Sequence, residues 1–106
     1  MLRDSRPGIV VHGVDTVMEG EQAEGVADAG EKGMKVLQRG GSALDAVEAA
    51  VRTMEDAGVF DAGLGSVLCP DGKIRMHAAV MDGRTLGAGA VILISEVKNP
   101  VWSPER

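Results

Sequence analysis

The sequence has very few aromatic residues: one Phe, one Trp and no Tyr in 106 positions. Aromatic side chains bury the largest apolar areas in protein cores. A core built from Ala, Val, Leu and Met is therefore thin, and we expect its stability to depend on surface supplied by a partner. A chain of this length forms at most one domain.

Other absences narrow the class of protein. A single cysteine, Cys69, excludes an internal disulfide and is typical of a reducing compartment. No apolar run approaches the roughly 20 residues of a membrane span, and the polar N-terminus lacks the apolar stretch of a signal peptide. We therefore expect a cytoplasmic protein with no membrane partner. The net charge of -5 and the lack of a Lys/Arg stripe argue against a nucleic-acid partner.

Generic motifs for chemistry are also missing. There is no zinc spacing, because His12, His77 and Cys69 stand singly, and neither GxGxxG nor the phosphate-loop pattern occurs. His77 falls in the polar register of a strand pattern and is interpreted as facing solvent. His12, before Gly13 at the end of an apolar run, has two open interpretations: a structural histidine or a neighbour of an active site.

The stretch over residues 39–68 organises the rest of the chain. Gly40-Gly41 suits a helix end, Ser42 is a natural N-cap, and Asp45 can complete a capping box. The helix that follows is predicted to stop at Gly58. Its apolar positions recur at helical spacing with alanines between them, which indicates close packing against another layer. These positions are Leu44, Val47, Val51 and Met54, with Ala43, Ala46, Ala49 and Ala50 between them.

The flanking patterns predict one more helix and several strands. Periodicity favours a helix over 21–38, in which Gly25, Gly30 and Gly33 require supporting neighbours or very close packing. Strands are expected over 9–11, 65–69, 73–80 and 87–95, with a hairpin turn at Pro70-Asp71-Gly72 and no element after Pro100. This order predicts an α+β fold with helices on one face of an antiparallel sheet. Because the last strand is almost wholly apolar, we expect something outside these residues to cover the other face.

Four segments carry a resemblance to a known family: GGSALDAVEAAVRTMED, FDAGLGSVL, DGKIRMHAAVMDGRTLGAGAV and VKNP. In order and spacing they resemble the N-terminal half of plant-type L-asparaginases and isoaspartyl peptidases, which are threonine N-terminal-nucleophile hydrolases. The resemblance covers roughly residues 8–100 and is most specific from Gly40 to Val91. The first segment, IVVHGVDTV, is similar to the family's first strand and its His-Gly-Gly loop, in altered form.

The resemblance implies a fold, an activity and a partner. Two stacked sheets covered by helices form a four-layer αββα sandwich, of which residues 1–106 are a single, incomplete domain like the α subunit. A precursor cuts itself before a threonine, and the freed threonine on the β subunit attacks the amide carbon while its α-amine accepts the proton. An oxyanion hole stabilises the intermediate. The implied substrates are L-asparagine and isoaspartyl (β-aspartyl) dipeptides, and the implied assembly is (αβ)2 or a homo-oligomer.

The resemblance also implies site residues. The matching loop binds sodium through backbone carbonyls, a ligand type that suits a hard cation, and no organic cofactor is implied; an interpretation without an ion also stays open. His12, Gly13 and Asp61 are implied active-site neighbours. Asp61 replaces the family's asparagine and Val14 alters the His-Gly-Gly loop, which puts tuning of the nucleophile and self-cleavage in doubt. The implied sodium ligands are the carbonyls of Met54, Glu55, Ala57, Phe60, Ala62 and Leu64.

No threonine of this chain is predicted to be the nucleophile. Thr16, Thr53 and Thr85 are all internal. Two hypotheses of different class therefore remain. In the first, the chain is an enzyme subunit that pairs with a β chain bearing an N-terminal threonine. In the second, it is a non-catalytic structural or binding fragment of the same fold. The carboxylates Glu55, Asp56 and Asp61 could suggest a cation, but they are interpreted as solvated. Asp82 and Arg84 are interpreted as a surface ion pair.

Overall fold

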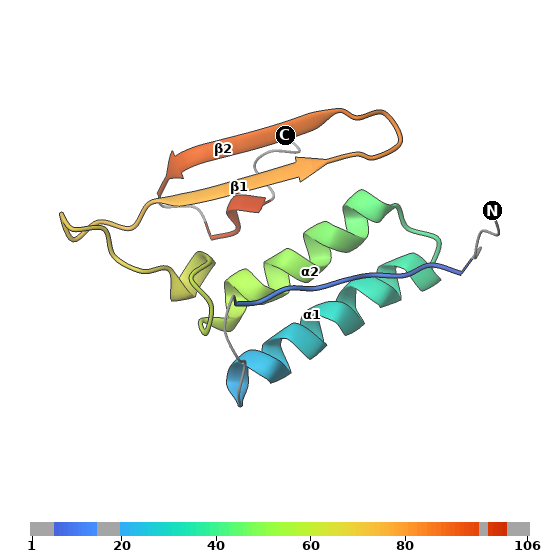
Figure 1. The fold of residues 1–106 in the computed structure, drawn as a ribbon, viewed down its shortest axis with the longest axis horizontal. Coiled ribbons are helices and arrows are strands. Elements are labelled where there is room, and N and C mark those ends of the chain that lie inside the picture. Colours follow the sequence, from blue (N-terminus) through green and yellow to red (C-terminus); the bar gives the residue numbers. More distant parts are fainter. Residues whose placement is uncertain (1–5, 15–19, 96–97, 102–106) are drawn as a thin grey trace.

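The computed structural model describes residues 6–14, 20–95 and 98–101. It contains helices α1 (Glu21–Gln38) and α2 (Ala43–Ala57), one 3-10 turn η1 (Gly63–Gly65), and strands β1 (Met76–Met81) and β2 (Ala88–Ile94). The strands form a two-stranded antiparallel sheet. Figure 1 shows α1 and α2 side by side, with the sheet along the side of α2 that faces away from α1. The predicted α+β class is confirmed.

The two helices pack closely because their contact is made of small residues. Ala29 of α1 and Ala46 and Ala50 of α2 are almost completely buried. A Cβ atom built on Gly33 would lie 3.5 Å from the Cβ atom of Ala50 and 3.1 Å from the carbonyl oxygen of Ala46. Small side chains let the helix backbones approach each other, as the alanine pattern predicted. The larger residues Val47 and Val51 instead lie on the open side of α2.

The capping signals at both ends of α2 are confirmed. The Ser42 hydroxyl accepts a hydrogen bond from the Asp45 backbone N–H at 3.0 Å, and the Asp45 carboxylate accepts one from the Ser42 N–H at 3.4 Å. Together they form the reciprocal capping box, which satisfies N–H groups that the first helical turn leaves unpaired. The helix ends at Gly58, whose φ of 76° is left-handed.

The predicted strand over 9–11 is wrong for this structure. Residues 7–14 are extended but pair with no strand, and Val10 is 97% exposed. The segment crosses the helices instead (Figure 1). The Cδ1 atom of Ile9 occupies the place where a Cβ on Gly33 would be, and Val11 lies against Gly30. The glycines of α1 therefore make room for this segment.

The predicted strand over 65–69 is also wrong. Gly63–Gly65 forms a 3-10 turn, and residues 66–69 are irregular. Any Cβ on Gly65 would overlap the carbonyl of Phe60, so the chain is folded back too tightly here for a strand ladder. Leu68, which the predicted strand would have buried, is 60% exposed.

The hairpin turn and the return strand follow the prediction more closely. Cys69 donates its N–H to the Lys73 carbonyl at 2.8 Å, which closes the turn at Pro70-Asp71-Gly72. Residues of β1 alternate in burial, with Met76 buried and His77 exposed. The β1–β2 register shifts between Met76 and Ala78. At this bulge, Nδ1 of His77 accepts the Leu93 N–H at 3.2 Å.

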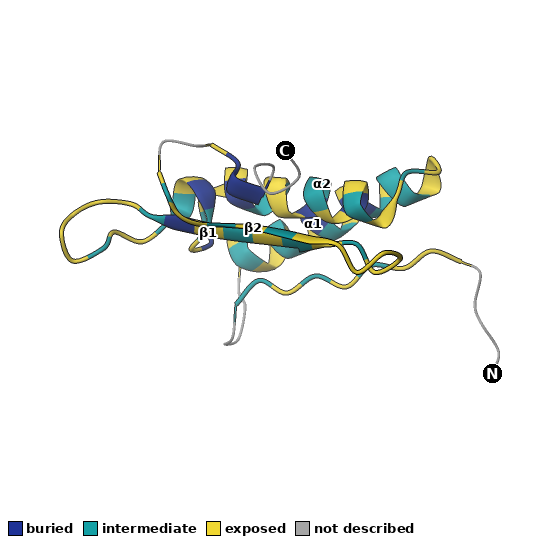
Figure 2. Ribbon diagram, turned by 90° about the horizontal axis from the view of Figure 1, so that it is seen from above, coloured by how far each residue is buried: buried dark blue, intermediate teal, exposed yellow. Residues whose placement is uncertain are grey.

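The sheet is open on much of its surface. Figure 2 shows both strands as exposed or intermediate along most of their length, whereas buried residues gather near the C-terminal end of α2. Ile92 is 73% exposed, although it lies in an almost wholly apolar strand. Residues 98–101 return to this buried region, where Pro100 and Val101 begin a short 3-10 turn. The prediction that no element follows Pro100 is therefore wrong for Val101.

Candidate functional site

The loop over residues 60–67 follows α2 and carries most of the predicted site residues. Phe60 is buried and anchors the loop against α1, where its ring meets Gly25. Gly63, at a φ of 53°, touches the Glu55 backbone so closely that a Cβ would overlap the Glu55 carbonyl. Only glycine fits such an approach with left-handed geometry. The loop is thus folded directly onto the last turn of α2.

Asp61 fixes the far end of this loop. Its Oδ1 accepts the backbone N–H of Val67 at 2.8 Å, across six residues. An asparagine could make the same bond through its amide oxygen, but it would carry an NH2 donor where Asp61 has a second carboxylate oxygen. Asp61 therefore holds the loop as an asparagine could, and it adds a negative charge.

A small cavity of about 160 Å³ lies between this loop and the start of β1. It brings together two carboxylates, a hydroxyl, a guanidinium and an imidazole. The Arg75 guanidinium is turned toward Asp71, which it binds through two hydrogen bonds of 3.0 and 2.7 Å. The His77 ring is held by Leu93, as described above. The lining residues are Glu55, Asp61, Ala62, Ser66, Arg75, Met76 and His77.

Glu55 is the buried charge of this region, with 3% of its surface exposed. Its Oε1 accepts a hydrogen bond from Nδ2 of Asn99 at 3.2 Å, and its Oε2 accepts the backbone N–H of Val101 at 3.1 Å. Burial raises the pKa of Glu55, and these two hydrogen bonds oppose that rise. We call this arrangement the Glu55 clasp. The interpretation of Glu55 as a solvated carboxylate is wrong.

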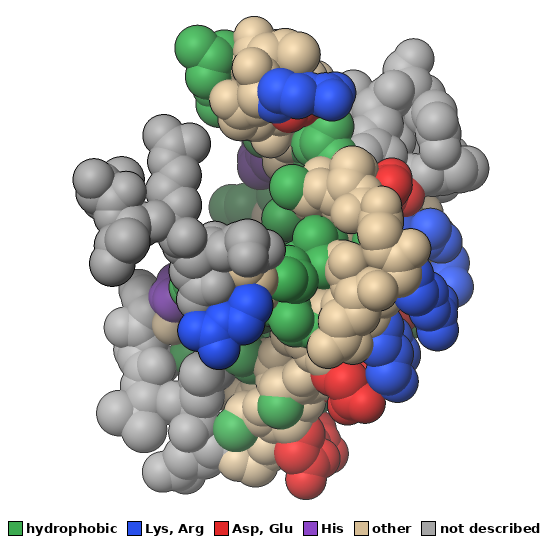
Figure 3. Space-filling model, turned by 90° about the vertical axis from the view of Figure 1, so that its right-hand side faces the viewer, with side chains coloured by type: hydrophobic (Ala, Val, Ile, Leu, Met, Phe, Trp, Pro, Cys, Tyr) green, Lys and Arg blue, Asp and Glu red, His purple; other side chains and the backbone are tan. Residues whose placement is uncertain are grey.

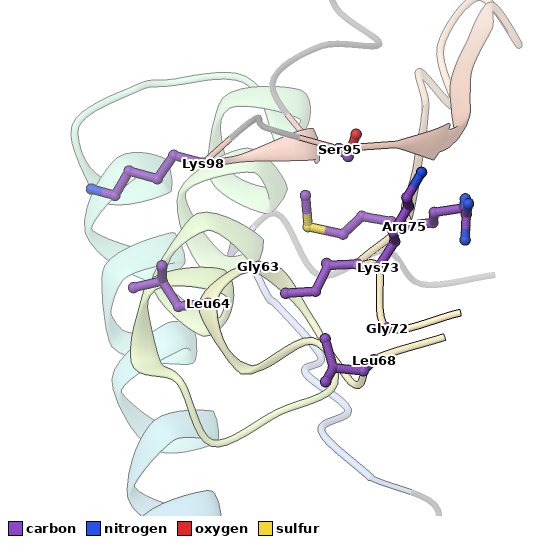
Figure 4. Close-up of a pocket in the computed structure, with 10 residues that line it drawn as sticks. Gly63, Leu64, Leu68, Gly72, Lys73, Arg75, Ser95 and Lys98 are labelled. Atoms are coloured by element: carbon purple, nitrogen blue, oxygen red, sulfur yellow. The ribbon is translucent and has the colours of Figure 1, made fainter. Parts of the chain in front are cut away.

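A second, larger hollow of about 820 Å³ opens beside the loop. Figure 4 shows Leu64 and Leu68 on the loop side, Lys73 and Arg75 on the hairpin, and Ser95 and Lys98 after β2. The Lys98 side chain extends toward α2, where its Nζ lies 3.9 Å from the Asp56 carboxylate. The residues that line this hollow include both apolar and basic side chains.

The other predicted site residues are only partly brought together. His12 is exposed and Gly13 half-buried in the N-terminal segment, and neither lines the small cavity, whereas Asp61 does. Val14 is half-buried in that same segment. The predicted surface pair forms, with Arg84 Nη2 3.6 Å from Asp82 Oδ2.

The described threonines have structural partners. The Thr53 hydroxyl donates to the Ala49 carbonyl at 2.8 Å within α2, and the Thr85 hydroxyl accepts the Gly87 N–H at 3.2 Å. Thr16 lies outside the described residues. Among the described residues there is also no group of three or more His, Cys, Asp or Glu side chains placed to hold a metal ion.

The sequence prediction missed Asn99 and Val101. Their hydrogen bonds to Glu55 span 44 and 46 residues, and no local spacing reveals such a contact. One signal was available. Glu55 lies four residues after Val51, so a carboxylate occupies a position next to the apolar helical face. A charge there needs buried partners.

Comparison with known proteins agrees with these features. The family model described as asparaginase matches residues 5–104. The chain is 52% identical over 98 residues to the plant-type L-asparaginase of Thermococcus kodakarensis. The matched region covers 88% of this chain and 32% of that protein. It is 46% identical over 98 residues to the isoaspartyl peptidase/L-asparaginase of Rattus norvegicus, covering 88% of this chain and 29% of the relative. It is 48% identical over 99 residues to the isoaspartyl peptidase/L-asparaginase of Danio rerio. That match covers 90% of this chain and 32% of the relative.

The two helices and the antiparallel strand pair are thus an α+β part of the N-terminal-nucleophile hydrolase fold. The chain belongs to the asparaginase family, whose named relatives here are amide hydrolases. It spans about a third of the length of these relatives. None of the described helices is long and apolar enough to cross a membrane.

Proposed function

We propose that this chain is the α-subunit-like part of an amidohydrolase that cleaves L-asparagine and isoaspartyl dipeptides. The nucleophile in this proposal is the N-terminal threonine of a separate β subunit. The observation that carries the proposal is the 52% identity to a plant-type L-asparaginase over a region that makes up a third of that protein. The engaged hydroxyls of Thr53 and Thr85 support placing the nucleophile elsewhere.

In this proposal, the chain supplies one wall of the substrate chamber. Asp61 lines the small cavity with its loop held in shape by Val67. The open sheet, with Ile92 and Leu93 exposed, is the surface that the β subunit covers. Figure 3 shows apolar side chains gathered in the middle of one face of the molecule, with charged side chains along its edge. An (αβ)2 assembly or a homo-oligomer buries such a face.

In this proposal the loop after α2 holds a sodium ion through backbone carbonyls, as the family resemblance implies. The last carbonyls of a helix have no partner inside the helix, which leaves those of Glu55 and Ala57 for other ligands. Gly63 and Gly65 lie against the carbonyls of Glu55 and Phe60, so closely that a Cβ on either glycine would overlap them. Neutral backbone oxygens suit a hard cation. A bound sodium ion would supply a fixed positive charge that stiffens this loop.

Reconstitution tests the proposal. The chain is mixed or co-expressed with the two thirds of the Thermococcus kodakarensis relative that it does not match. Native mass spectrometry measures assembly, and ammonia and aspartate release measure hydrolysis of L-asparagine and of an isoaspartyl dipeptide. We expect a complex that hydrolyses both substrates. A complex that forms and hydrolyses neither contradicts the enzymatic proposal and favours the non-catalytic fragment.

A further inference from the structure

The strand pair β1–β2 changes register once, at His77. Two residues of β2, Ile92 and Leu93, lie opposite this single residue of β1. Beyond that point Met76 pairs with Ile94, whereas an unshifted ladder would pair it with Leu93. A β-bulge of this kind adds one residue to one strand and leaves that residue without a ladder partner. The conformation of the extra residue therefore depends on other contacts.

The bulge decides which apolar side chains of β2 face outward. Exposed and half-buried residues alternate along β2 as far as Ile92, and then Leu93 is exposed as well. Ile94 is half-buried as a result, although an unbroken alternation would expose it. Sliding the end of β2 into the unshifted register would exchange Leu93 and Ile94, because a one-residue slip turns each side chain to the opposite face.

Leu93 is held in an unfavourable conformation by one side chain. Its φ is 52°, in the left-handed region where the Cβ atom of a leucine is crowded and where glycine is usual. Its backbone N–H donates to Nδ1 of His77 at 3.2 Å. That nitrogen can accept only while it carries no proton, in the neutral ring that has its hydrogen on Nε2. The bulge therefore depends on an acceptor that a histidine loses on protonation.

We propose that His77 is a pH-sensitive switch of strand register: its neutral ring holds β2 in the bulged register, and protonation of Nδ1 releases β2 to the unshifted one. With a proton on Nδ1, two N–H donors face each other and the hydrogen bond is lost. The strain at Leu93 then favours a return to regular strand geometry. Histidine suits such a switch, because it is the side chain type that ordinarily changes charge near neutral pH. The inference does not depend on the proposed function, since no step of it involves hydrolysis.

Other charged groups share the surroundings of this ring. Three charged residues line the same small cavity: Glu55 of α2, Asp61 of the loop over residues 60–67, and Arg75 before β1. The Arg75 guanidinium is engaged with Asp71, and β2 carries no charged residue. Carboxylates also gain protons on acidification. A response that comes from them persists when the imidazole is removed, whereas a response of the bulge does not.

The experiment is an NMR titration of the 106-residue chain from about pH 8 to about pH 5. The ring resonances of His77 give the midpoint of its protonation. Amide exchange of Leu93, relative to an unstructured peptide at the same pH, measures the hydrogen bond, and cross-strand nuclear Overhauser effects from Met76 report the register. We expect protection of Leu93 to fall about tenfold with the same midpoint. The contact of Met76 should move from Ile94 to Leu93.

Three variants sharpen the test. His77→Phe keeps a ring and removes the acceptor, so we expect the unshifted register at every pH. Leu93→Gly removes the left-handed strain, so the bulge should persist after acidification. His12→Phe is the matched control, because it removes the second histidine of the chain, which is exposed in the N-terminal segment. It should leave the response unchanged.

The wild-type chain decides the matter even if a variant does not fold. Protection of Leu93 and a Met76 contact that stay constant through the His77 midpoint overturn the inference. A response retained in folded His77→Phe overturns it as well, because that response would come from the carboxylates. A Leu93→Gly protein that loses the bulge on acidification as readily as the wild type would contradict the role of strain on which the switch depends.

Discussion

A Cβ atom on Gly25 would lie 2.8 Å from Cε2 and 2.9 Å from Cζ of Phe60. The aromatic ring that anchors the site loop therefore packs against a glycine in the second turn of α1. Glycine costs a helix about 1 kcal/mol relative to alanine. The chain accepts this cost where the ring of Phe60, its single Phe and 3% exposed, must approach the helix backbone.

We predict that Gly25→Ala destabilises the protein, although alanine is the better helix former. The added methyl group overpacks the site against Phe60, which typically costs about 1–3 kcal/mol. Gly30→Ala is the matched control. Its Cβ would meet Val11 at an ordinary 3.7 Å, so we expect a gain of up to about 1 kcal/mol. Urea unfolding measures the change in the free energy of unfolding of both variants. A stabilised Gly25→Ala protein would contradict the close packing of Phe60 against Gly25.

The capping box of α2 yields a second prediction. Ser42→Ala removes the acceptor for the Asp45 N–H and should lower the free energy of unfolding by about 1 kcal/mol. Asp45→Asn keeps a side-chain oxygen for the Ser42 N–H and should cost less. Thermal unfolding of the two variants checks this order. If Ser42→Ala were the milder change, α2 would not depend on this cap.

The turn before β1 makes a prediction about pH. Two hydrogen bonds from Arg75 and one from the Lys73 N–H hold the pKa of Asp71 below its ordinary value. A lowered folded-state pKa means that the carboxylate stabilises the turn above the ordinary pKa of an aspartate. This contribution is lost as the pH falls through the lowered value.

NMR titration of the Asp71 carboxyl group checks the direction of this shift. The midpoint should lie below that of an ordinary aspartate and move up toward it in Arg75→Gln. The Lys73 amide, which donates to the same carboxylate, should follow the same midpoint. An unchanged midpoint in the variant would mean that the paired guanidinium does not set the pKa.

Local chemistry made much of the fold predictable from the sequence. The bounds of α1, the cap at Ser42, the stop at Gly58 and the turn at Asp71 each depend on residues close in the chain. The strands over 9–11 and 65–69 were mispredicted because a strand needs a pairing neighbour, which a β-branched run cannot supply by itself. Ile9 and Val11 instead pack on helix glycines.

The site was predictable in part. The glycine spacing and the family resemblance pointed to the loop after α2, and Asp61 does line a cavity there. The Glu55 clasp was not predictable from spacing, because Asn99 and Val101 come from the far end of the chain. His77 was predicted to face solvent and does, but its bond to Leu93 depends on a bulge that the strand pattern does not show.

The most direct test of the account is ammonia release from L-asparagine by the purified chain alone, under conditions in which the reconstituted complex is active. The account places the nucleophile on another polypeptide, so we predict no release above buffer. Measurable turnover by a verified single chain would contradict it.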